Sequence, residues 1–247
     1  MLILLSILLI IAVTVLVLLT RKEEKYRLKN LNKDDINKIN ILMIGNSFIL
    51  KNNMHKMLQE MLGSQYSVDV IAKPAYSLKR HLQNPQLEQA LKNKKYQYVV
   101  MQEKSSIPIK FPERLSKNFG DMIKYISQYQ QAWIPVIYET YGRCYISDPN
   151  PLLTQTMIDD AYENVSEEYN AKLAKVGEAF LKFRVMDKFE VTDSILFNCK
   201  RKDVIHPTQM GSILTAMVFY RLFTDNLIQG QGPDKILEVF REIVNNM

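Results

Sequence analysis

Short apolar runs and longer amphipathic stretches alternate along the chain from Asn40 onward. Short segments rich in apolar residues predict strands at 41–44, 66–72, 96–101, 133–138 and 173–176. Apolar residues at three- and four-residue spacing predict helices at 53–62, 78–91 (interrupted near Pro85), 112–129, around 157–169, after Pro207 and at 235–244. Strands that alternate with helices pair in parallel through right-handed crossovers. We therefore predict one three-layer α/β domain over residues 40–247, with about five parallel strands.

The first 19 residues carry no charge, and Ser6 and Thr14 are their only polar side chains. A helix of about 18–20 residues spans roughly 27–30 Å, the thickness of the hydrocarbon core of a bilayer. A cleaved signal peptide has a basic start, a shorter apolar run and a small-x-small cleavage site. This segment has an uncharged start, a longer apolar run and no such site. We predict a retained transmembrane helix over residues 1–20, and a cleaved signal peptide is the alternative.

The positive charge of the chain is concentrated directly after this apolar segment. The net charge is +6, and residues 21–38 hold seven basic against four acidic side chains. This predicts a basic juxtamembrane stalk over 21–39 rather than a nucleic-acid surface, so no nucleic-acid partner is expected. Basic residues follow the helix and none precedes it, so the positive-inside rule places the C-terminal domain in the cytoplasm.

Composition and missing motifs exclude several function classes. With 47% hydrophobic and 23% charged residues, the chain is neither disordered nor fibrous. Two cysteines, Cys144 and Cys199, are too few for a disulfide scaffold, and the sequence leaves open whether they pair. Dinucleotide, P-loop and His-Glu-x-x-His motifs are absent, and Ile49 replaces the second glycine of a Gly-x-Ser-x-Gly elbow. We expect neither a cofactor nor a metal.

The first candidate for chemistry is Ser47, in the run Gly45-Asn46-Ser47-Phe48 between the first strand and the first helix. Catalytic groups of parallel sheets lie at the carboxyl ends of the strands, where this serine would be. Its backbone N–H would belong to a helix N-terminus, which favours a developing negative charge. The alternative is a plain helix cap, because Asn and Ser are preferred capping residues.

The second candidate is the run from Asp203 to Pro207, which contains one of three histidines, His206. The following proline keeps His206 out of helical geometry. If the segment is a tight loop, Asp203 can reach the Nδ1 atom of His206 and leave Nε2 to accept a proton from a serine hydroxyl. The alternative is that Asp203 and His206 are ordinary polar residues of a loop, without a catalytic role. His55 and His81 have helical neighbours and are interpreted as surface residues.

The third candidate is Gln102-Glu103-Lys104-Ser105, which closes the third strand. An amide or ammonium group there could donate to an oxyanion. Polar residues are common after apolar strands, so this run is weak evidence by itself.

Together these runs resemble the SGNH (GDSL-type) hydrolases, and more narrowly a branch with Gly-Asn-Ser-Phe and Gln-Glu-x-Ser blocks. The resemblance extends from Ile41 to Thr224 and includes the segments 74–81, 99–105, 176–180 and 203–211. It implies a flavodoxin-like sheet and ester hydrolysis through a Ser-His-Asp triad. Ser47 is then the nucleophile, His206 the general base and Asp203 the orienting acid.

The resemblance also implies an oxyanion hole, in which the Ser47 N–H is one donor. The second block of the family supplies a backbone N–H from glycine, whereas this chain has Pro74-Ala75, so Ala75 is the candidate donor. The third block supplies an asparagine side chain, for which Gln102 and Lys104 are the candidates here. Because one lost donor costs about 10²–10³ in rate, these changes could weaken catalysis without abolishing it.

The sequence therefore predicts a membrane-anchored serine esterase acting on small acyl esters, O-acetyl groups on carbohydrate above all. An O-acyltransferase that uses the same triad, and a catalytically silent binding module with this fold, are the alternatives. The family analogy favours a substrate outside the cell, against the charge rule.

Overall fold

The computed structural model describes residues 38–148, 150–186, 189–199, 203–229 and 234–247. Residues Ile39–Met247 form one compact unit. The predicted membrane helix (1–20) and nearly all of the predicted stalk (21–39) lie outside the described residues. Within the described ranges, no helix has the length and apolar character that crossing a bilayer requires.

The centre of the fold is a five-stranded parallel sheet. Its strands are β1 (Ile39–Gly45), β2 (Tyr66–Ala72), β3 (Tyr98–Met101), β4 (Ile134–Tyr138) and β5 (Lys172–Ala174). Their order is β2-β1-β3-β4-β5, with parallel pairing throughout. This is the flavodoxin-like order of doubly wound sheets. The prediction of an α/β fold with a parallel sheet of about five strands is confirmed.

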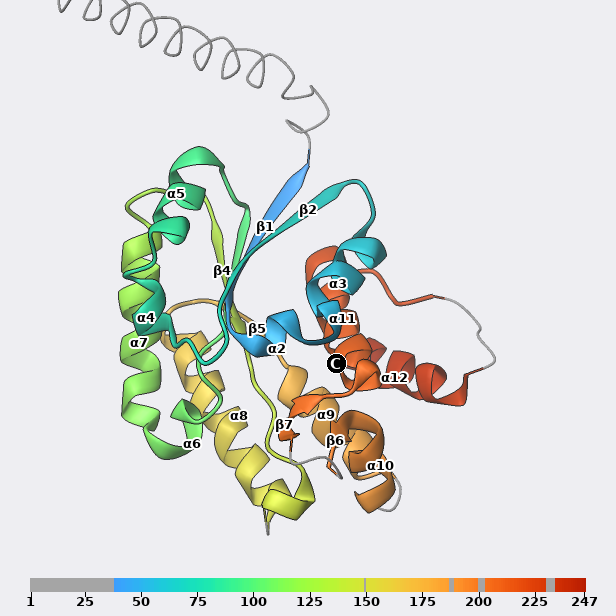
Figure 1. Ribbon diagram of the computed structural model, residues 1–247. Helices are drawn as coiled ribbons and strands as arrows, with labels where there is room; N and C mark the ends of the chain where they lie inside the picture. The colour runs from blue at the N-terminus through green and yellow to red at the C-terminus, as the bar shows by residue number, and fades with distance from the viewer. Residues whose placement is uncertain (1–37, 149, 187–188, 200–202, 230–233) are drawn as a thin grey trace, which may run out of the picture. The chain divides into compact units, whose positions relative to one another are not determined.

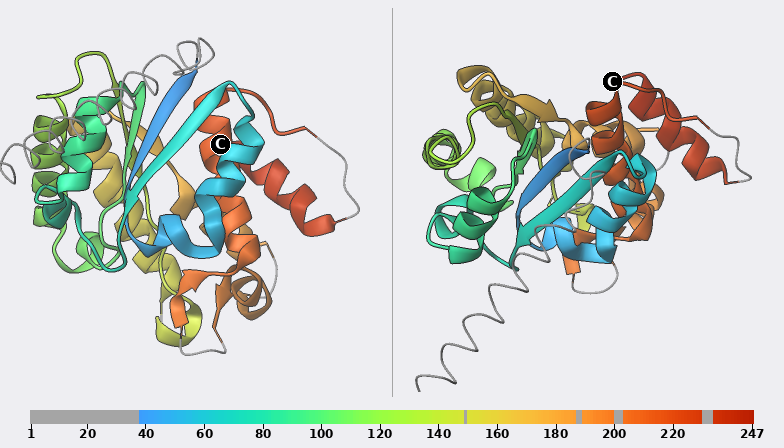
Figure 2. Two further views of the ribbon diagram at one scale, coloured as in Figure 1. Left: turned by 45° about the horizontal axis from the view of Figure 1, so that its top comes forward. Right: turned by 90° about the horizontal axis from the view of Figure 1, so that it is seen from above.

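Helices cover both faces of the sheet because the buried strands carry apolar side chains on both faces (Figures 1 and 2). In β1, Ile41 and Met43 join one apolar cluster, whereas Leu42 and Ile44 join the other. The first cluster takes in α3 (Met54–Leu62), α9 (Val176–Arg184), α11 (Gln209–Thr224) and α12 (Lys235–Asn245). The second takes in α4 (Leu78–His81), α5 (Pro85–Asn93), α7 (Pro112–Ile126) and α8 (Pro151–Glu168).

Several elements were not predicted from the pattern of the sequence. They are α6 (Ile107–Lys110), α9, α10 (Phe189–Leu196) and a two-stranded antiparallel sheet of β6 (Phe197–Asn198) and β7 (Asp203–Pro207). Gly177 lies inside α9 rather than ending a strand. A Cβ there would come within 2.6 Å of the Thr140 carbonyl oxygen, so close packing of α9 against the end of β4 requires glycine. Residues 203–207, for which a tight loop was the condition of an Asp203–His206 contact, form the extended strand β7.

Candidate active site

Ser47 is the first residue of the short helix α2 (Ser47–Leu50), directly beyond the carboxyl end of β1. Asn46 is the N-cap of this helix, and its side chain accepts a hydrogen bond from the Phe48 N–H at 3.2 Å. Asn46 thus does the capping that was the alternative role for Ser47. A Cβ at Gly45 would lie 2.5 Å from Oε1 and 2.9 Å from Cβ of Gln102, so the close approach of Gln102 to the end of β1 requires glycine.

The fold brings Ser47, His206 and Asp203 into one chain of hydrogen bonds, although 159 positions separate the serine from the histidine. The Ser47 Oγ atom lies 2.8 Å from Nε2 of His206. The Nδ1 atom of His206 lies 2.7 Å from Oδ1 of Asp203, which also accepts the His206 backbone N–H at 3.2 Å. A neutral ring that donates Nδ1–H to the carboxylate leaves Nε2 to accept the serine proton.

The Asp203 carboxylate is stabilised in its charged form. Burial alone raises the pKa of Asp203, but the hydrogen bonds from His206 and the charges of His206 and Lys51 bring the net pKa below its usual value. The Lys51 Nζ atom lies 3.6 Å from Oδ2 of Asp203. Asp203 is therefore ionised at neutral pH, as an orienting acid must be.

Asn52 joins the nucleophile segment to the histidine segment. Its Nδ2 atom donates to the Pro207 carbonyl at 3.0 Å and to the Ser212 Oγ at 2.9 Å. Asn52 has φ 53° and ψ 20°, a left-handed conformation that asparagine tolerates better than most residues. The edge of the Phe48 ring also contacts the His206 ring, with centroids 5.8 Å apart. Sequence reasoning missed Asn52, because no sequence motif indicates a side chain that hydrogen-bonds two segments far apart in the chain.

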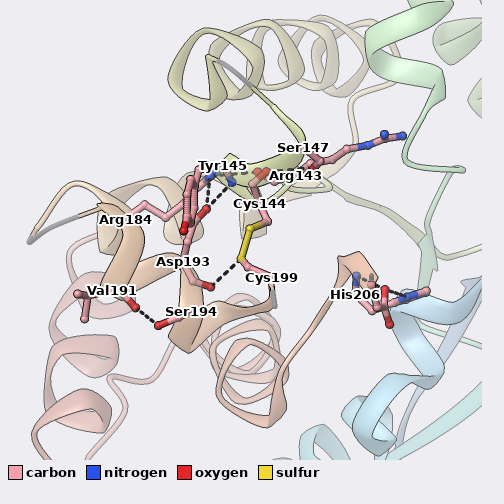
Figure 3. Close-up of a disulfide and its surroundings, with 11 residues drawn as sticks. Arg143, Cys144, Tyr145, Ser147, Arg184, Val191, Asp193, Ser194, Cys199 and His206 are labelled. Atoms are coloured by element: carbon pink, nitrogen blue, oxygen red, sulfur yellow. Dashed lines mark hydrogen bonds and ion pairs between the residues drawn. A yellow bond between two sulfur atoms is a disulfide. The ribbon is translucent and has the colours of Figure 1, made fainter. Parts of the chain in front are cut away.

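A disulfide between Cys144 and Cys199 ties the β6–β7 hairpin to the loop that follows β4 (Figure 3). The Cα atoms of the two cysteines are 5.9 Å apart, and the Cys144 N–H donates to the Val204 carbonyl at 3.3 Å. Beside the disulfide, Arg184 and Asp193 form a fully buried ion pair, with Nη2 and Oδ2 2.9 Å apart. Cys144 and Cys199 therefore do pair, which the sequence left open, and their disulfide helps to hold the strand bearing His206.

Two of the predicted oxyanion donors have free backbone N–H groups. Within the described part of the chain, neither the Ser47 N–H nor the Ala75 N–H has a hydrogen-bond acceptor. Ala75 has φ 61° and is closed into its turn by a hydrogen bond from the Tyr76 N–H to the Lys73 carbonyl at 3.1 Å. This left-handed conformation is the one glycine adopts most easily, which accounts for a glycine at the matching position of the family.

The structure does not support the Gln102 side chain as an oxyanion donor. Gln102 is fully buried; its Oε1 accepts the Asn46 N–H at 2.9 Å, and its Nε2 donates to the Glu103 carbonyl. Its amide therefore supports the turn before Ser47. Lys104 has an exposed side chain, and its backbone N–H donates to the Glu103 carboxylate at 2.6 Å.

Two further polar residues support the loops at this edge of the sheet. The prediction that His81 lies at the surface is wrong: it is fully buried, and its Nε2 atom contacts the Gly45 carbonyl at 2.7 Å. Burial lowers the pKa of His81 and keeps the ring neutral. Buried Glu103 accepts hydrogen bonds from Leu78, Lys104 and Asn118, and burial raises its pKa. His55 is half-buried, with Nδ1 3.3 Å from the Ile49 carbonyl.

One group of possible metal ligands occurs among the described residues, namely Cys144, Asp193 and Cys199. Because both sulfur atoms belong to the disulfide, neither can supply a thiolate to a metal. The donor set therefore does not fit a metal centre.

No family model and no curated protein matches the chain. Solved structures do match. A candidate SGNH hydrolase from Slackia heliotrinireducens is 27% identical, covers 76% of this chain and 100% of its own, and has a TM-score of 0.63. A DUF4886 family protein from Bacteroides uniformis is 18% identical over 85% of this chain and 94% of its own, with a TM-score of 0.63. A mutant of an acetyl-xylooligosaccharide esterase from Geobacillus is 11% identical over 78% and 97%, with a TM-score of 0.56.

Proposed function

We propose that this chain, a member of the SGNH hydrolase superfamily, is a serine esterase that removes small acyl groups, O-acetyl groups on carbohydrate above all. Hydrolysis of ester bonds is the reaction class of the superfamily members that it resembles. The observation that carries the proposal is the hydrogen-bonded series Ser47–His206–Asp203, with 2.8 Å and 2.7 Å between successive side chains. The acetyl-xylooligosaccharide esterase among the similar structures supports the choice of acyl group.

The proposed reaction has two steps, and in each of them His206 acts first as the base and then as the acid. Nε2 of His206 takes the Ser47 hydroxyl proton as Oγ attacks the ester carbonyl, and the charge of Asp203 stabilises the imidazolium. The N–H groups of Ser47 and Ala75 donate to the oxyanion. Protonated His206 then gives its proton to the departing alcohol, which leaves an acyl-serine. His206 then deprotonates a water molecule, which attacks the acyl carbonyl; the bond between the acyl group and Oγ breaks, the acid leaves, and His206 returns its proton to Ser47.

The test compares the full-length protein with Ser47→Ala on p-nitrophenyl acetate. Loss of the nucleophile should lower kcat by about 10³-fold or more. Ser64→Ala, at an exposed serine on the turn before β2, is the matched control and should keep the wild-type rate. A fluorophosphonate should label Ser47 in the wild-type protein. Equal rates for wild type and Ser47→Ala would refute the proposal and favour a silent binding module.

We propose further that residues 1–20 anchor the protein in a membrane and that the domain lies on the oxidising, outer side. The uncharged run of 19 residues supports the anchor. The Cys144–Cys199 disulfide supports the outer face, since disulfides persist in oxidising compartments, and weighs against the charge rule. Membranes washed with carbonate should retain the full-length chain, and added protease should cleave the domain in intact cells. Release by the wash would refute the anchor, and protection from protease would refute the outer face.

A further inference from the structure

The three loops that surround Ser47 leave the sheet side by side. Gly45 of β1 pairs with Ala72 of β2, and Ile44 pairs with Met101 of β3. The neighbouring strands are therefore in register at their carboxyl ends, about 5 Å apart. Residues directly after Ala72 and Met101 consequently flank the Ser47 segment on its two sides.

These loops carry a group of cations that we call the basic rim: Lys51, Lys73, Arg80 and Lys104. Lys51 follows α2, Lys73 and Arg80 belong to the loop and helix after β2, and Lys104 follows β3. The sequence has no Asp or Glu between Gly45 and Glu60, and none between Lys73 and Glu88. Two of the three loops are thus purely basic.

Packing connects part of the basic rim to Tyr76, whose carbonyl contacts the residue before the nucleophile. The Arg80 guanidinium lies 4.1 Å from the centre of the Tyr76 ring, and the Lys73 Nζ atom lies 5.5 Å from it. The Tyr76 carbonyl in turn accepts a hydrogen bond at 3.1 Å from the Nδ2 atom of Asn46, the residue before Ser47. The ring therefore places two positive charges on the loop that carries Ala75.

Little negative charge offsets these cations. Among the residues that the structure describes, Lys73, Arg80 and Lys104 form no ion pair, whereas cations elsewhere do, as in Lys94–Asp69 and Lys117–Asp121. Glu103 is fully buried, and its carboxylate accepts three hydrogen bonds, so it is not exposed to a substrate. The Asp203 carboxylate is occupied by His206 and Lys51. An incoming substrate therefore meets net positive charge.

We propose that the basic rim makes this site selective for acyl esters of negatively charged carbohydrates, in which an anionic group lies near the ester. The inference rests on the proposed esterase function and names its substrate class. One cation about 8 Å from a substrate charge changes binding about two- to sixfold at effective dielectric constants between about 80 and 40. Because the Asp203 carboxylate offsets Lys51, the other three cations of the rim carry the effect, and together they can give a preference of about tenfold.

The test uses two chromogenic esters, p-nitrophenyl acetate and its ring-carboxylated analogue, with each kcat/KM divided by the hydroxide rate constant of the same ester. At low ionic strength the wild type should prefer the anionic ester about tenfold. In 0.5 M NaCl, where screening acts within about 4 Å, most of this preference should vanish. The double variant Lys73→Gln/Arg80→Gln should lose about fourfold or more of it. Lys124→Gln, at an exposed lysine of α7, is the matched control and should retain the wild-type preference.

Acetate release from acetylated glucose, acetylated glucuronate and acetylated glucose phosphate then distinguishes a carboxylate from a phosphate as the recognised anion. Faster release from either anionic sugar supports the proposal. A wild type that hydrolyses both chromogenic esters equally, or a preference that Lys73→Gln/Arg80→Gln leaves intact, overturns it while the esterase function stands. A failure to hydrolyse any ester refutes the proposed function instead.

Discussion

Replacing Cys144 and Cys199 by alanine should make the protein much easier to unfold without changing its fold. The disulfide joins positions separated by 55 residues. In the chain-entropy treatment, a closed loop of that size lowers the entropy of the unfolded chain by about 14 cal/mol/K, or about 4 kcal/mol at 25 °C. Domains typically have unfolding free energies of about 5–15 kcal/mol, so the loss is a large part of the total.

The assay is urea unfolding at neutral pH, followed by the fluorescence of Trp133, the one tryptophan, which is half-buried just before β4. With an m-value of about 2 kcal/mol/M, the urea midpoint should fall by about 2 M. Wild-type protein in dithiothreitol is the second arm, because reduction keeps both sulfur atoms in place and leaves no cavity. The reduced protein should lose nearly as much stability as the double variant.

The disulfide also holds the strand that carries the proposed base, because Cys199 ends the β6 side of the hairpin and the Cys144 N–H bonds Val204 of β7. Esterase activity should therefore decline at lower urea concentrations in the reduced protein than the Trp133 signal does. Unchanged urea midpoints in both arms would refute the reasoning, since they would mean that the crosslink does not restrict the unfolded chain.

The other predictions concern single residues. Asn52→Gly keeps the left-handed backbone but removes two hydrogen bonds to the histidine segment, each worth about 1 kcal/mol. The kcat should therefore fall about tenfold or more with little change in KM, and an unchanged kcat would contradict the positioning role of Asn52. Ala75→Gly relieves left-handed strain of about 1–2 kcal/mol, which unfolded-state entropy offsets only in part, so the urea midpoint should rise, whereas Ala161→Gly inside α8 should lower it. Burial raises the pKa of Asp159 to about 6, which means that its contribution to stability is full below pH 3.8 and is lost as the pH rises through 6. Asp159→Asn should therefore gain stability relative to wild type as the pH increases from 4 to 7, measured as the difference in urea midpoint, and a constant difference would contradict the shifted pKa.

The sequence predicted the parallel sheet well because most of its strands are apolar runs, while β2 alternates apolar and polar residues, and glycine or polar residues follow the strands. β2 was predicted at its observed bounds, and β1 only began two residues earlier and ended one residue later than expected. The short strands β6 and β7 were missed because no apolar run marks them: β6 has only two residues, and β7 contains Asp203 and His206. Their position depends on the disulfide, which joins residues 55 positions apart, and on the buried Arg184–Asp193 ion pair.

The site was predictable where local chemistry decides geometry. His206 and Asp203 are three residues apart, so the sequence could name them as partners, although their contact forms in an extended strand rather than in the tight loop that the sequence argument required. The role of Gln102 was not predictable, because the choice between a donor facing the substrate and a support under the Asn46 turn depends on how closely β1 and β3 pack at Gly45. The burial of His81 is likewise a consequence of α4 packing over that turn.

The 159-residue gap between nucleophile and base also sets when activity first arises during synthesis. At about 5–20 residues per second, roughly 10–30 s pass between the translation of Ser47 and that of His206. In a nascent polypeptide, Ser47 consequently has no general base until the strand bearing His206 is in place. Esterase activity in a cell extract would therefore come only from chains that include His206. Shorter fragments from stalled ribosomes would have no activity.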